Sequence, residues 1–219
     1  MRATPELDFS TLYVFGAGGH GQEIAWVAEA AWSAAPEVVF LVDEQQRTAA
    51  EVAGRRVALV DEVDFHADSR FVVGVGDGSV RRRVSGELEQ RGAIAATIVH
   101  SSVQRSDSVV VGAGAVVFPG TVLTTNVMIG RHAHVNAGCT VSHDSTVGDF
   151  ATVSPGVHVA GRVRLGGGVF VGIGASIING APGSALVVGD DAVIAAGACV
   201  ISDVEGGSMV AGVPAVRKR

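Results

Sequence analysis

The chain has 219 residues, of which 47% are hydrophobic, 17% are charged and 5% are aromatic, and glycine contributes 30 of them. This composition is too apolar for a disordered chain, and no apolar run is long enough to indicate a transmembrane helix. The formal net charge is −6, and the one basic run, Arg81–Arg83, is expected on the solvent face of a helix. We therefore expect neither nucleic acid nor a membrane as a partner.

The first part of the chain alternates between strand-like and helix-like segments. Ile24, Val27 and Ala28 share one face of the first predicted helix. This alternation predicts an α/β domain, a small Rossmann-like parallel sheet, over residues 1–93. The strands are expected at 12–15, 38–42, 70–75 and 93–99, and the helices at 22–31 and 79–91.

A glycine-rich turn, Gly16-x-Gly18-x-x-Gly21, follows the first predicted strand and opens a helix. Glycines of this spacing let the backbone approach a pyrophosphate, and the helix N-terminus favours its negative charge. Asp43, at the end of the next strand, is suited to contact a ribose hydroxyl or a base. Because the domain lacks a second mononucleotide-binding half, the pattern favours a nucleotide-sugar over NAD. A tight turn without a ligand is the alternative.

The second part of the chain, residues 94–219, has a period of six. Every sixth residue from Val111 to Ile177 is aliphatic, and the residue four positions after each, from Ala115 to Ala181, is small or β-branched. A parallel β-helix has this period, because three hexads close one triangular coil and glycines supply the positive φ angles at its corners. An antiparallel sandwich would show a period of two instead. The aliphatic register resumes at Val188, Ile194 and Val200.

The register is interrupted at 179–185, where about five residues are inserted into one coil. Proline and glycine make this segment a loop that protrudes from a corner. It is either a tolerated surface insertion or a wall of a ligand cleft.

Three passages resemble the hexapeptide-repeat nucleotide-sugar acetyltransferases of the bacillosamine and perosamine pathways, and their sialic-acid O-acetyltransferase-like relatives. They are Phe15–Gly21, Val135–Asp144 and Val210–Ala215. The resemblance implies a left-handed parallel β-helix, a homotrimer with active sites between subunits, and acetyl-CoA as co-substrate. It implies transfer of an acetyl group to the amino group of a nucleotide-linked amino sugar.

The resemblance also implies a set of contacts for each substrate. Those to the nucleotide-sugar are Gly18, Gly19, His20, Asp43, Glu44, Gly76 and Ser79, and those to acetyl-CoA are Asn136, Thr152, Gly161, Ile173 and Ala196. The backbone N–H of Gly161 would stabilise the oxyanion. Many relatives have a second histidine where Thr152 stands; a threonine there can form a hydrogen bond but cannot carry a charge.

Among the seven histidines, only His143 is followed directly by a carboxylate, that of Asp144. Acetyl transfer from a thioester needs a base that removes a proton from the nucleophile, and histidine is suited to this at neutral pH. The neighbouring acid can orient the imidazole. The resemblance makes His143 the general base and Asp144 its orienting partner; an ordinary surface dipeptide is the alternative.

Cysteine chemistry is not expected to contribute. Cys139 and Cys199 lie sixty residues apart with no CxxC spacing, which argues against a disulfide framework or a zinc knuckle. Cys139 occupies an inward position of a hexad, so it should be packed, and an acyl-enzyme is disfavoured. No signal peptide is visible at the start of the chain, and we expect a cytoplasmic protein.

Three other functions remain open at this point. O-acetylation of a sugar hydroxyl would use the same base. A zinc-dependent carbonic anhydrase on the same coil would need three converging histidines, but His132 and His134 lie two apart on one flat face, and such anhydrases lack a nucleotide-binding domain; no metal is expected. A nucleotide-sugar sensor or scaffold that kept the fold is the non-enzymatic alternative.

Overall fold

The computed structural model describes residues 5–46 and 49–218. Contacts divide the chain into a first unit that ends at Ser101 and a second that begins at Ser102, whereas the sequence suggested a division after residue 93. Residues 94–101 are hydrogen-bonded to the rest of the first unit. Phe71 N donates to Ile94 O at 2.9 Å and Ser101 N to Ala30 O at 3.1 Å. This segment forms a single bridge, Phe71 to Ala95, and the two-residue strand β6 (Ile98–Val99), in place of one continuous closing strand.

The first unit contains a five-stranded sheet with the order β3-β4-β2-β1-β5. β1, β2, β4 and β5 are parallel, and β3 joins β4 in an antiparallel hairpin. β3 and β4 were not predicted, because β3 has only two residues and β4 opens with two arginines, Arg55 and Arg56. The strands are β1 (Thr11–Phe15), β2 (Glu37–Val42), β3 (Glu51–Val52), β4 (Arg55–Leu59) and β5 (Ser69–Val73).

Two α-helices accompany this sheet, α1 (Gly19–Ala28) and α2 (Gly78–Gln90). α1 begins three residues earlier than predicted, because Gly18 is its N-cap. Ile24, Val27 and Ala28 are fully buried, which confirms the predicted face. In α2, Val84 and Leu88 pack into the core formed by the aromatic and aliphatic residues of the sheet.

The basic run Arg81–Arg83 was expected on the solvent face of α2, and this was wrong for its first member. Arg82 and Arg83 are exposed, but Arg81 is completely buried. Its guanidinium donates to the carbonyls of Val75 and Gly76 at 2.8 and 3.2 Å. Burial lowers the pKa of Arg81 to about 10, although Asp77 acts in the opposite direction. Arg81 therefore stabilises the turn between β5 and α2.

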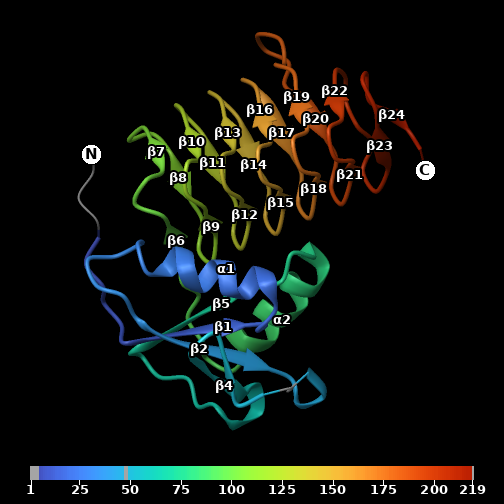
Figure 1. The fold of residues 1–219 in the computed structure, drawn as a ribbon. Coiled ribbons are helices and arrows are strands. Elements are labelled where there is room, and N and C mark those ends of the chain that lie inside the picture. Colours follow the sequence, from blue (N-terminus) through green and yellow to red (C-terminus); the bar gives the residue numbers. More distant parts are fainter. Residues whose placement is uncertain (1–4, 47–48, 219) are drawn as a thin grey trace. The chain divides into compact units, whose positions relative to one another are not determined.

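The second unit is a parallel β-helix whose coils are stacked in chain order (Figure 1). Paired residues lie eighteen apart, as in Val122 with Thr140 and Met128 with Thr146. Three hexads therefore form one coil, as predicted. The strands are β7 (Gln104–Arg105), β8 (Val110–Val111), β9 (Val116–Val117), β10 (Val122–Leu123), β11 (Met128–Ile129), β12 (His134–Val135), β13 (Thr140–Val141), β14 (Thr146–Val147), β15 (Thr152–Val153), β16 (His158–Val159), β17 (Val163–Leu165), β18 (Phe170–Val171), β19 (Ser176–Ile177), β20 (Leu186–Val188), β21 (Val193–Ile194), β22 (Cys199–Val200), β23 (Met209–Ala211) and β24 (Val216–Arg217).

The core of the β-helix consists of the predicted ladders. Every sixth residue from Val117 to Ile177 is buried, and Val111, in the first coil, is partly exposed. The small partners from Ala115 to Ala175 are buried as well. Ala181 was counted as the next small partner, but it is exposed because the chain has already left the coil there. Leu165 pairs with Val188, twenty-three positions on, so the insertion is absorbed between β19 and β20.

The corners of the coils use left-handed backbone at every sixth position from 114 to 174. Glycine was expected at these corners, but Asn126, His132, Asp144, Phe150 and Arg162 also adopt φ angles of 51–58°. Asparagine and aspartate tolerate this conformation because their short side chains form local hydrogen bonds. At another corner the rings of His132 and Phe150 stack with their centroids 5.2 Å apart. Glycine is therefore one of several ways to turn the corner.

Candidate active site

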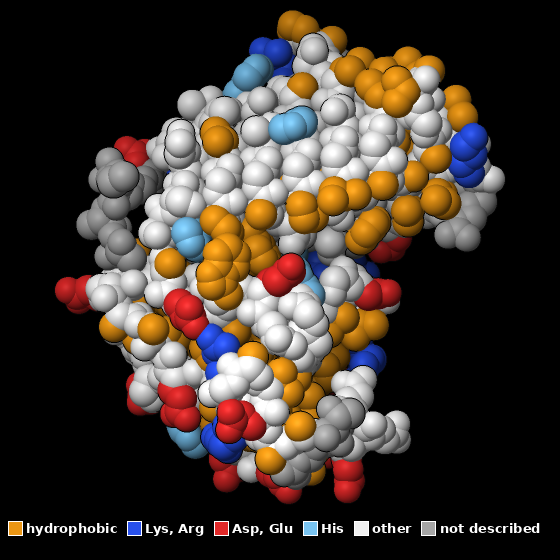
Figure 2. All heavy atoms as spheres, viewed as in Figure 1, with side chains coloured by type: hydrophobic (Ala, Val, Ile, Leu, Met, Phe, Trp, Pro, Cys, Tyr) orange, Lys and Arg blue, Asp and Glu red, His pale blue; other side chains and the backbone are white. Residues whose placement is uncertain are grey.

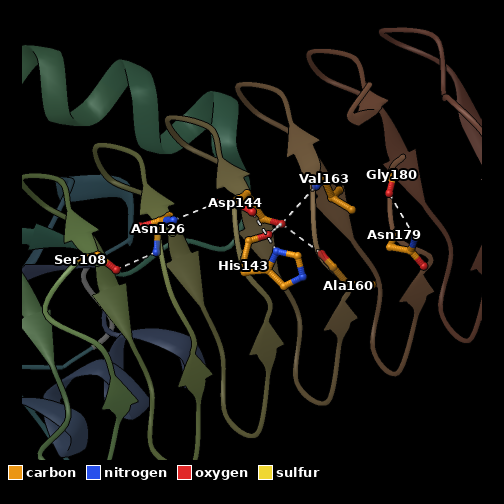
Figure 3. A network of polar contacts seen from close by, with 9 residues as sticks. Ser108, Asn126, His143, Asp144, Ala160, Val163, Asn179 and Gly180 are labelled. Atoms are coloured by element: carbon orange, nitrogen blue, oxygen red, sulfur yellow. Dashed lines mark hydrogen bonds and ion pairs between the residues drawn. The ribbon is translucent and has the colours of Figure 1, made fainter. Parts of the chain in front are cut away.

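His143 and Asp144 lie at the corner between β13 and β14, with their side chains close to half exposed. His143 Nδ1 is 2.9 Å from Asp144 Oδ2 (Figure 3). The hydrogen bond to His143, followed by one from Asn126, lowers the pKa of the Asp144 carboxyl. Asp144 is therefore ionised at neutral pH and accepts a hydrogen bond from the Nδ1–H group of His143. This tautomer is assigned from the hydrogen-bond network. Nε2 is left with its lone pair and can act as a base.

The His143 ring lies directly over the backbone of Gly161. A methyl group added at Gly161 would lie 2.5 Å from His143 Nε2, too close for any residue other than glycine without movement of the ring. Among the described residues, none accepts a hydrogen bond from the Gly161 amide. This corner therefore brings a base nitrogen close to the residue whose N–H was expected to stabilise the oxyanion.

Hydrogen bonds hold the chain on both sides of Gly161. Arg162 N donates to His143 O at 2.9 Å, and Gly180 N donates to Gly161 O at 3.0 Å. The Ser145 hydroxyl accepts from Val163 N at 3.1 Å and donates to the Ala160 carbonyl at 3.0 Å. The segment that carries Gly161 is thus fixed relative to His143.

The other residues expected to contact acetyl-CoA form two pairs. Ile173 and Ala196 are exposed on neighbouring coils, where Gly197 N donates to Ile173 O at 2.9 Å. Asn136 and Thr152 are buried. The Asn136 amide group donates to Val153 O at 2.8 Å. The structure thus brings Ile173 and Ala196 to an outer edge and gives Asn136 an internal hydrogen bond.

Cys139 is fully buried in the coil, and its thiol donates to the Ser154 carbonyl at 3.1 Å. Burial raises the pKa of Cys139 to about 11. The thiol is therefore protonated at neutral pH and is a poor nucleophile.

In the first unit, three predicted segments follow neighbouring parallel strands. The glycine-rich turn follows β1, Asp43 and Glu44 follow β2, and the 74–79 turn follows β5. β1 lies between β2 and β5, so the three segments meet at the carboxyl edge of the sheet. After β1 the chain forms β2 on one side of β1, and it later forms β5 on the other side of β1. This edge is therefore a topological switch point, which is the usual place for a ligand in an open α/β sheet.

The glycines of this turn have two different roles. Gly16 has a φ of 99°, and a methyl group at Gly21 would lie 1.9 Å from Gly16 O, so both are required by the turn itself. A methyl group at Gly18 or Gly19 would meet nothing within 4 Å. These two glycines leave open space at the N-terminus of α1, where a phosphate would be favoured.

The remaining predicted contacts of the first unit differ in their surroundings. His20 Nδ1 is 3.2 Å from Glu23 Oε2, and burial lowers the pKa of His20. The Ser79 hydroxyl donates to Asp77 at 2.6 Å, and Asp77 also accepts from two backbone N–H groups as the N-cap of α2. Ser79 is therefore engaged in the helix cap. Asp43 is partly buried and Glu44 is exposed.

Asn126 and Ser108 were not predicted from the sequence. Asn126 Nδ2 donates to Asp144 Oδ1 at 3.0 Å, and Asn126 N donates to Ser108 Oγ at 2.8 Å (Figure 3). These residues lie eighteen and thirty-six positions before Asp144. The coil period could have found them, because residues one coil apart share a corner.

Within residues 5–46 and 49–218, no three side chains of His, Cys, Asp or Glu are grouped so that they could hold a metal ion. None of the helices in these ranges is both long and apolar enough to cross a membrane.

Comparison with known proteins identifies the family. Residues 11–88 match the PglD N-terminal domain. The chain is similar to WeeI from Acinetobacter baumannii (27% identity, TM-score 0.88, 95% of this chain and 100% of that one). It is also similar to the acetyltransferase domain of PglB from Neisseria gonorrhoeae (30% identity, TM-score 0.85, 95% of this chain and 99% of that one). The chain belongs to the hexapeptide-repeat nucleotide-sugar acetyltransferases, with a Rossmann-like domain followed by a left-handed β-helix.

Two further relatives carry information on ligands. PerB from Caulobacter crescentus (27% identity, TM-score 0.84, 96% of this chain and 98% of that one) was solved in complex with CoA and GDP-perosamine. GDP-perosamine N-acetyltransferase from Escherichia coli O157:H7 is 35% identical over 119 residues, which are 54% of this chain and 54% of that enzyme. The chain thus spans about half the length of the curated relative that it matches.

Proposed function

We propose that this protein transfers the acetyl group of acetyl-CoA to the amino group of a nucleotide-linked amino sugar. The observation that carries the proposal is the corner at which His143 Nε2 lies over Gly161 while Nδ1 faces an ionised carboxylate, 2.9 Å from its oxygen. A base poised in this way is what an amine nucleophile needs. The two ligands of the PerB complex correspond to the partners of such a reaction: GDP-perosamine is an amino-sugar acceptor, and CoA is the thiol that acetyl-CoA leaves behind.

The reaction proceeds by direct attack. The sugar amine attacks the acetyl carbonyl, and His143 Nε2 takes the amine proton as the C–N bond forms. The N–H of Gly161 stabilises the oxyanion. The C–S bond then breaks, and the proton passes from His143 to the departing thiolate. Asp144 holds the proton-bearing nitrogen and stabilises the imidazolium.

The acceptor is a nucleotide-sugar held at the carboxyl edge of the first unit's sheet. Its phosphates approach Gly18 and Gly19, and Asp43 and Glu44 contact the ribose or the base. The open space at Gly18 and Gly19 supports this assignment. GDP-perosamine is the first acceptor to test, because it is bound by PerB.

Acetyl-CoA lies along the outer edge that presents Ile173 and Ala196. The 179–185 loop forms one wall of its cleft. The hydrogen bond from Gly180 N to Gly161 O supports this, because it joins the base of the loop to the catalytic corner.

The enzyme acts as a cytoplasmic homotrimer. Exposed apolar side chains on the sheet that contains β8, β11 and β20 support self-association, since Val110 and Met128 are 58% and 55% exposed. Hydrophobic side chains gather in rows over the coils (Figure 2). Neighbouring exposed apolar side chains such as Val110 and Met128 are typical of an interface.

A panel of nucleotide-linked amino sugars tests the proposal. The enzyme is supplied with acetyl-CoA and each sugar in turn, and free thiol release is followed. We expect one or more GDP-, UDP- or dTDP-linked amino sugars to release thiol and to gain a base-stable acetyl group. A base-labile acetyl product would instead identify an O-acetyltransferase. Absence of turnover with the whole panel, together with no binding of acetyl-CoA, would contradict the proposal.

A further inference from the structure

A column of polar residues stands behind Asp144. Ser108, Asn126 and Asp144 are spaced by eighteen and therefore occupy the same corner of successive coils. The Asn126 amide donates to Asp144 Oδ1 at 3.0 Å, and the other carboxylate oxygen, Oδ2, faces His143 Nδ1 at 2.9 Å. The two oxygens of one carboxylate are thus divided between Asn126 and the imidazole.

We infer that Asn126 is a positioning residue, which fixes the Asp144 carboxylate so that His143 is held in one orientation and one tautomer. The inference rests on the proposed function and extends it by one residue. Asn126 touches neither substrate in this account. It acts on the base through Asp144.

Exposure explains why a positioning residue is needed. His143 and Asp144 are 46% and 45% exposed, and a hydrogen-bonded pair of side chains in solvent is restricted only weakly. A carboxylate held at one oxygen has far less rotational freedom at the other. Arg162, at the next level of the corner, also acts on Asp144 through its charge, but it supplies no directional hydrogen bond to the carboxylate among those described.

The backbone of Asn126 is itself fixed. Its φ angle is 54°, in the left-handed region, and its N–H donates to Ser108 Oγ at 2.8 Å. Asp144 N donates in turn to Thr125 O at 3.1 Å, so the two corners are joined through the backbone as well as the side chains. Asparagine satisfies both demands of this position, because it tolerates left-handed backbone and its amide can donate where a carboxylate cannot.

Two substitutions at this position separate positioning from folding. Asn126→Gly removes the amide group and keeps left-handed backbone accessible, while Asn126→Asp keeps the shape and replaces the donor by a charge. Asp191→Gly is the control, because Asp191 occupies another left-handed corner with a φ of 56°. We expect Asn126→Gly to lower kcat about tenfold, the lower end of the range for loss of one hydrogen bond to a charged group, with the KM for acetyl-CoA within about twofold. The control should leave both constants unchanged.

The pH profile adds a readout that a merely structural role would not move. A second carboxylate in Asn126→Asp favours the protonated imidazolium, so the acid limb of kcat/KM should move to higher pH. In Asn126→Gly the imidazole loses its fixed carboxylate, so the limb should stay or move to lower pH. The inference would be overturned if the acid limb of kcat/KM shifted identically in the two variants. It would also be overturned if Asn126→Gly had both the kcat and the pH profile of wild type.

Carbon-13 resonances of the Asp144 carboxyl group provide a test that needs no turnover. In Asn126→Gly the pKa of Asp144 should rise toward its ordinary value, because one of the hydrogen bonds that lower it is lost. An unchanged carboxyl titration would overturn the inference, whatever the activity. A wild-type protein that acetylates no nucleotide-sugar, yet shows the expected titration shift in the variant, would contradict only the proposed function.

Discussion

His143 depends on the absence of a side chain beneath it. Because a methyl group at Gly161 would lie 2.5 Å from Nε2, Gly161→Ala should push the imidazole away from its catalytic position. The ring is the far end of a side chain that is close to half exposed, so the variant should fold normally. We expect kcat to fall about a hundredfold, the usual scale for a displaced general base, with melting temperature within about 3 °C of wild type.

Gly130→Ala is the matched control for this substitution. A methyl group at Gly130 would lie 2.5 Å from the Asp149 backbone nitrogen, so the collision there involves the backbone of the next coil. It should therefore lower the melting temperature more than Gly161→Ala while the folded fraction keeps its turnover. Full activity in Gly161→Ala would show that the imidazole does not act from the position seen here.

The buried thiol of Cys139 separates direct transfer from an acyl-enzyme. With its pKa raised to about 11 by burial, Cys139 should resist alkylation of the folded protein at pH 8, whereas the partly exposed Cys199 should react. Mass spectrometry of the peptides after labelling measures both. Cys139→Ala should keep kcat within about threefold of wild type. Loss of turnover in this variant, together with labelling of Cys139 in the wild-type protein, would favour a covalent intermediate.

At the level of elements, the two insertions into regular structure have different consequences. The β3–β4 hairpin extends the sheet at an edge, where short strands and arginines give little sequence signal. The 179–185 loop interrupts a strict period and is therefore visible in the sequence. Its ends nearly meet, since a methyl group at Gly180 would lie 2.6 Å from the Leu186 nitrogen.

Deletion of residues 181–185 tests the loop as a wall of the acetyl-CoA cleft. Because the ends are so close, the shortened chain should restore an uninterrupted coil with a melting temperature within about 4 °C of wild type. We expect the KM for acetyl-CoA to rise about tenfold, from the loss of about 1.4 kcal/mol of binding free energy. An unchanged KM would identify the loop as a tolerated surface insertion.

The sequence predicted the β-helix accurately for a physical reason. Its core needs one aliphatic and one small residue per hexad, so burial is written into a period of six from Val117 to Ile177. Corner conformation is less visible, because Asn126, Phe150 and Arg162 adopt the left-handed backbone that glycine was expected to supply. Arg81 was misplaced for a similar reason. A charged side chain gives no sequence signal of burial when backbone carbonyls satisfy it.

The site is harder to predict because its groups come from different coils. His143 and Asp144 are adjacent in the sequence, so this pair could be proposed from the sequence directly, whereas the hydrogen bond from Asn126 joins residues eighteen apart. Such contacts follow from the coil period only after a first catalytic residue has been placed. For the proposed nucleotide-sugar site, the order β2-β1-β5 brings three loops together, and strand order is not encoded in local pattern.

At the scale of the whole molecule, the proposed self-association rests on exposed apolar side chains of the coil. Val110 and Met128 are partners in adjacent strands and both face solvent in the isolated chain. We expect a homotrimer, which light scattering should detect as about three times the chain mass of 22.2 kDa. Met128→Glu should shift this mass toward that of the monomer. Gln104→Glu, at an exposed position on a different sheet of the coil, adds the same single negative charge and should leave the mass unchanged. A monomeric wild-type protein would contradict the trimer.

The central claim is that His143 is the base for acetyl transfer between two bound substrates. The most direct measurement is a single-turnover experiment with an acceptor identified in the sugar panel, comparing wild type with His143→Ala at saturating acetyl-CoA. In His143→Ala we expect the rate of acetyl transfer to fall about a thousandfold, within the range for loss of a general base. The affinities for CoA and for the nucleotide-sugar should stay within about threefold of those of wild type. An acetyl-transfer rate equal to that of wild type in His143→Ala would contradict the central claim.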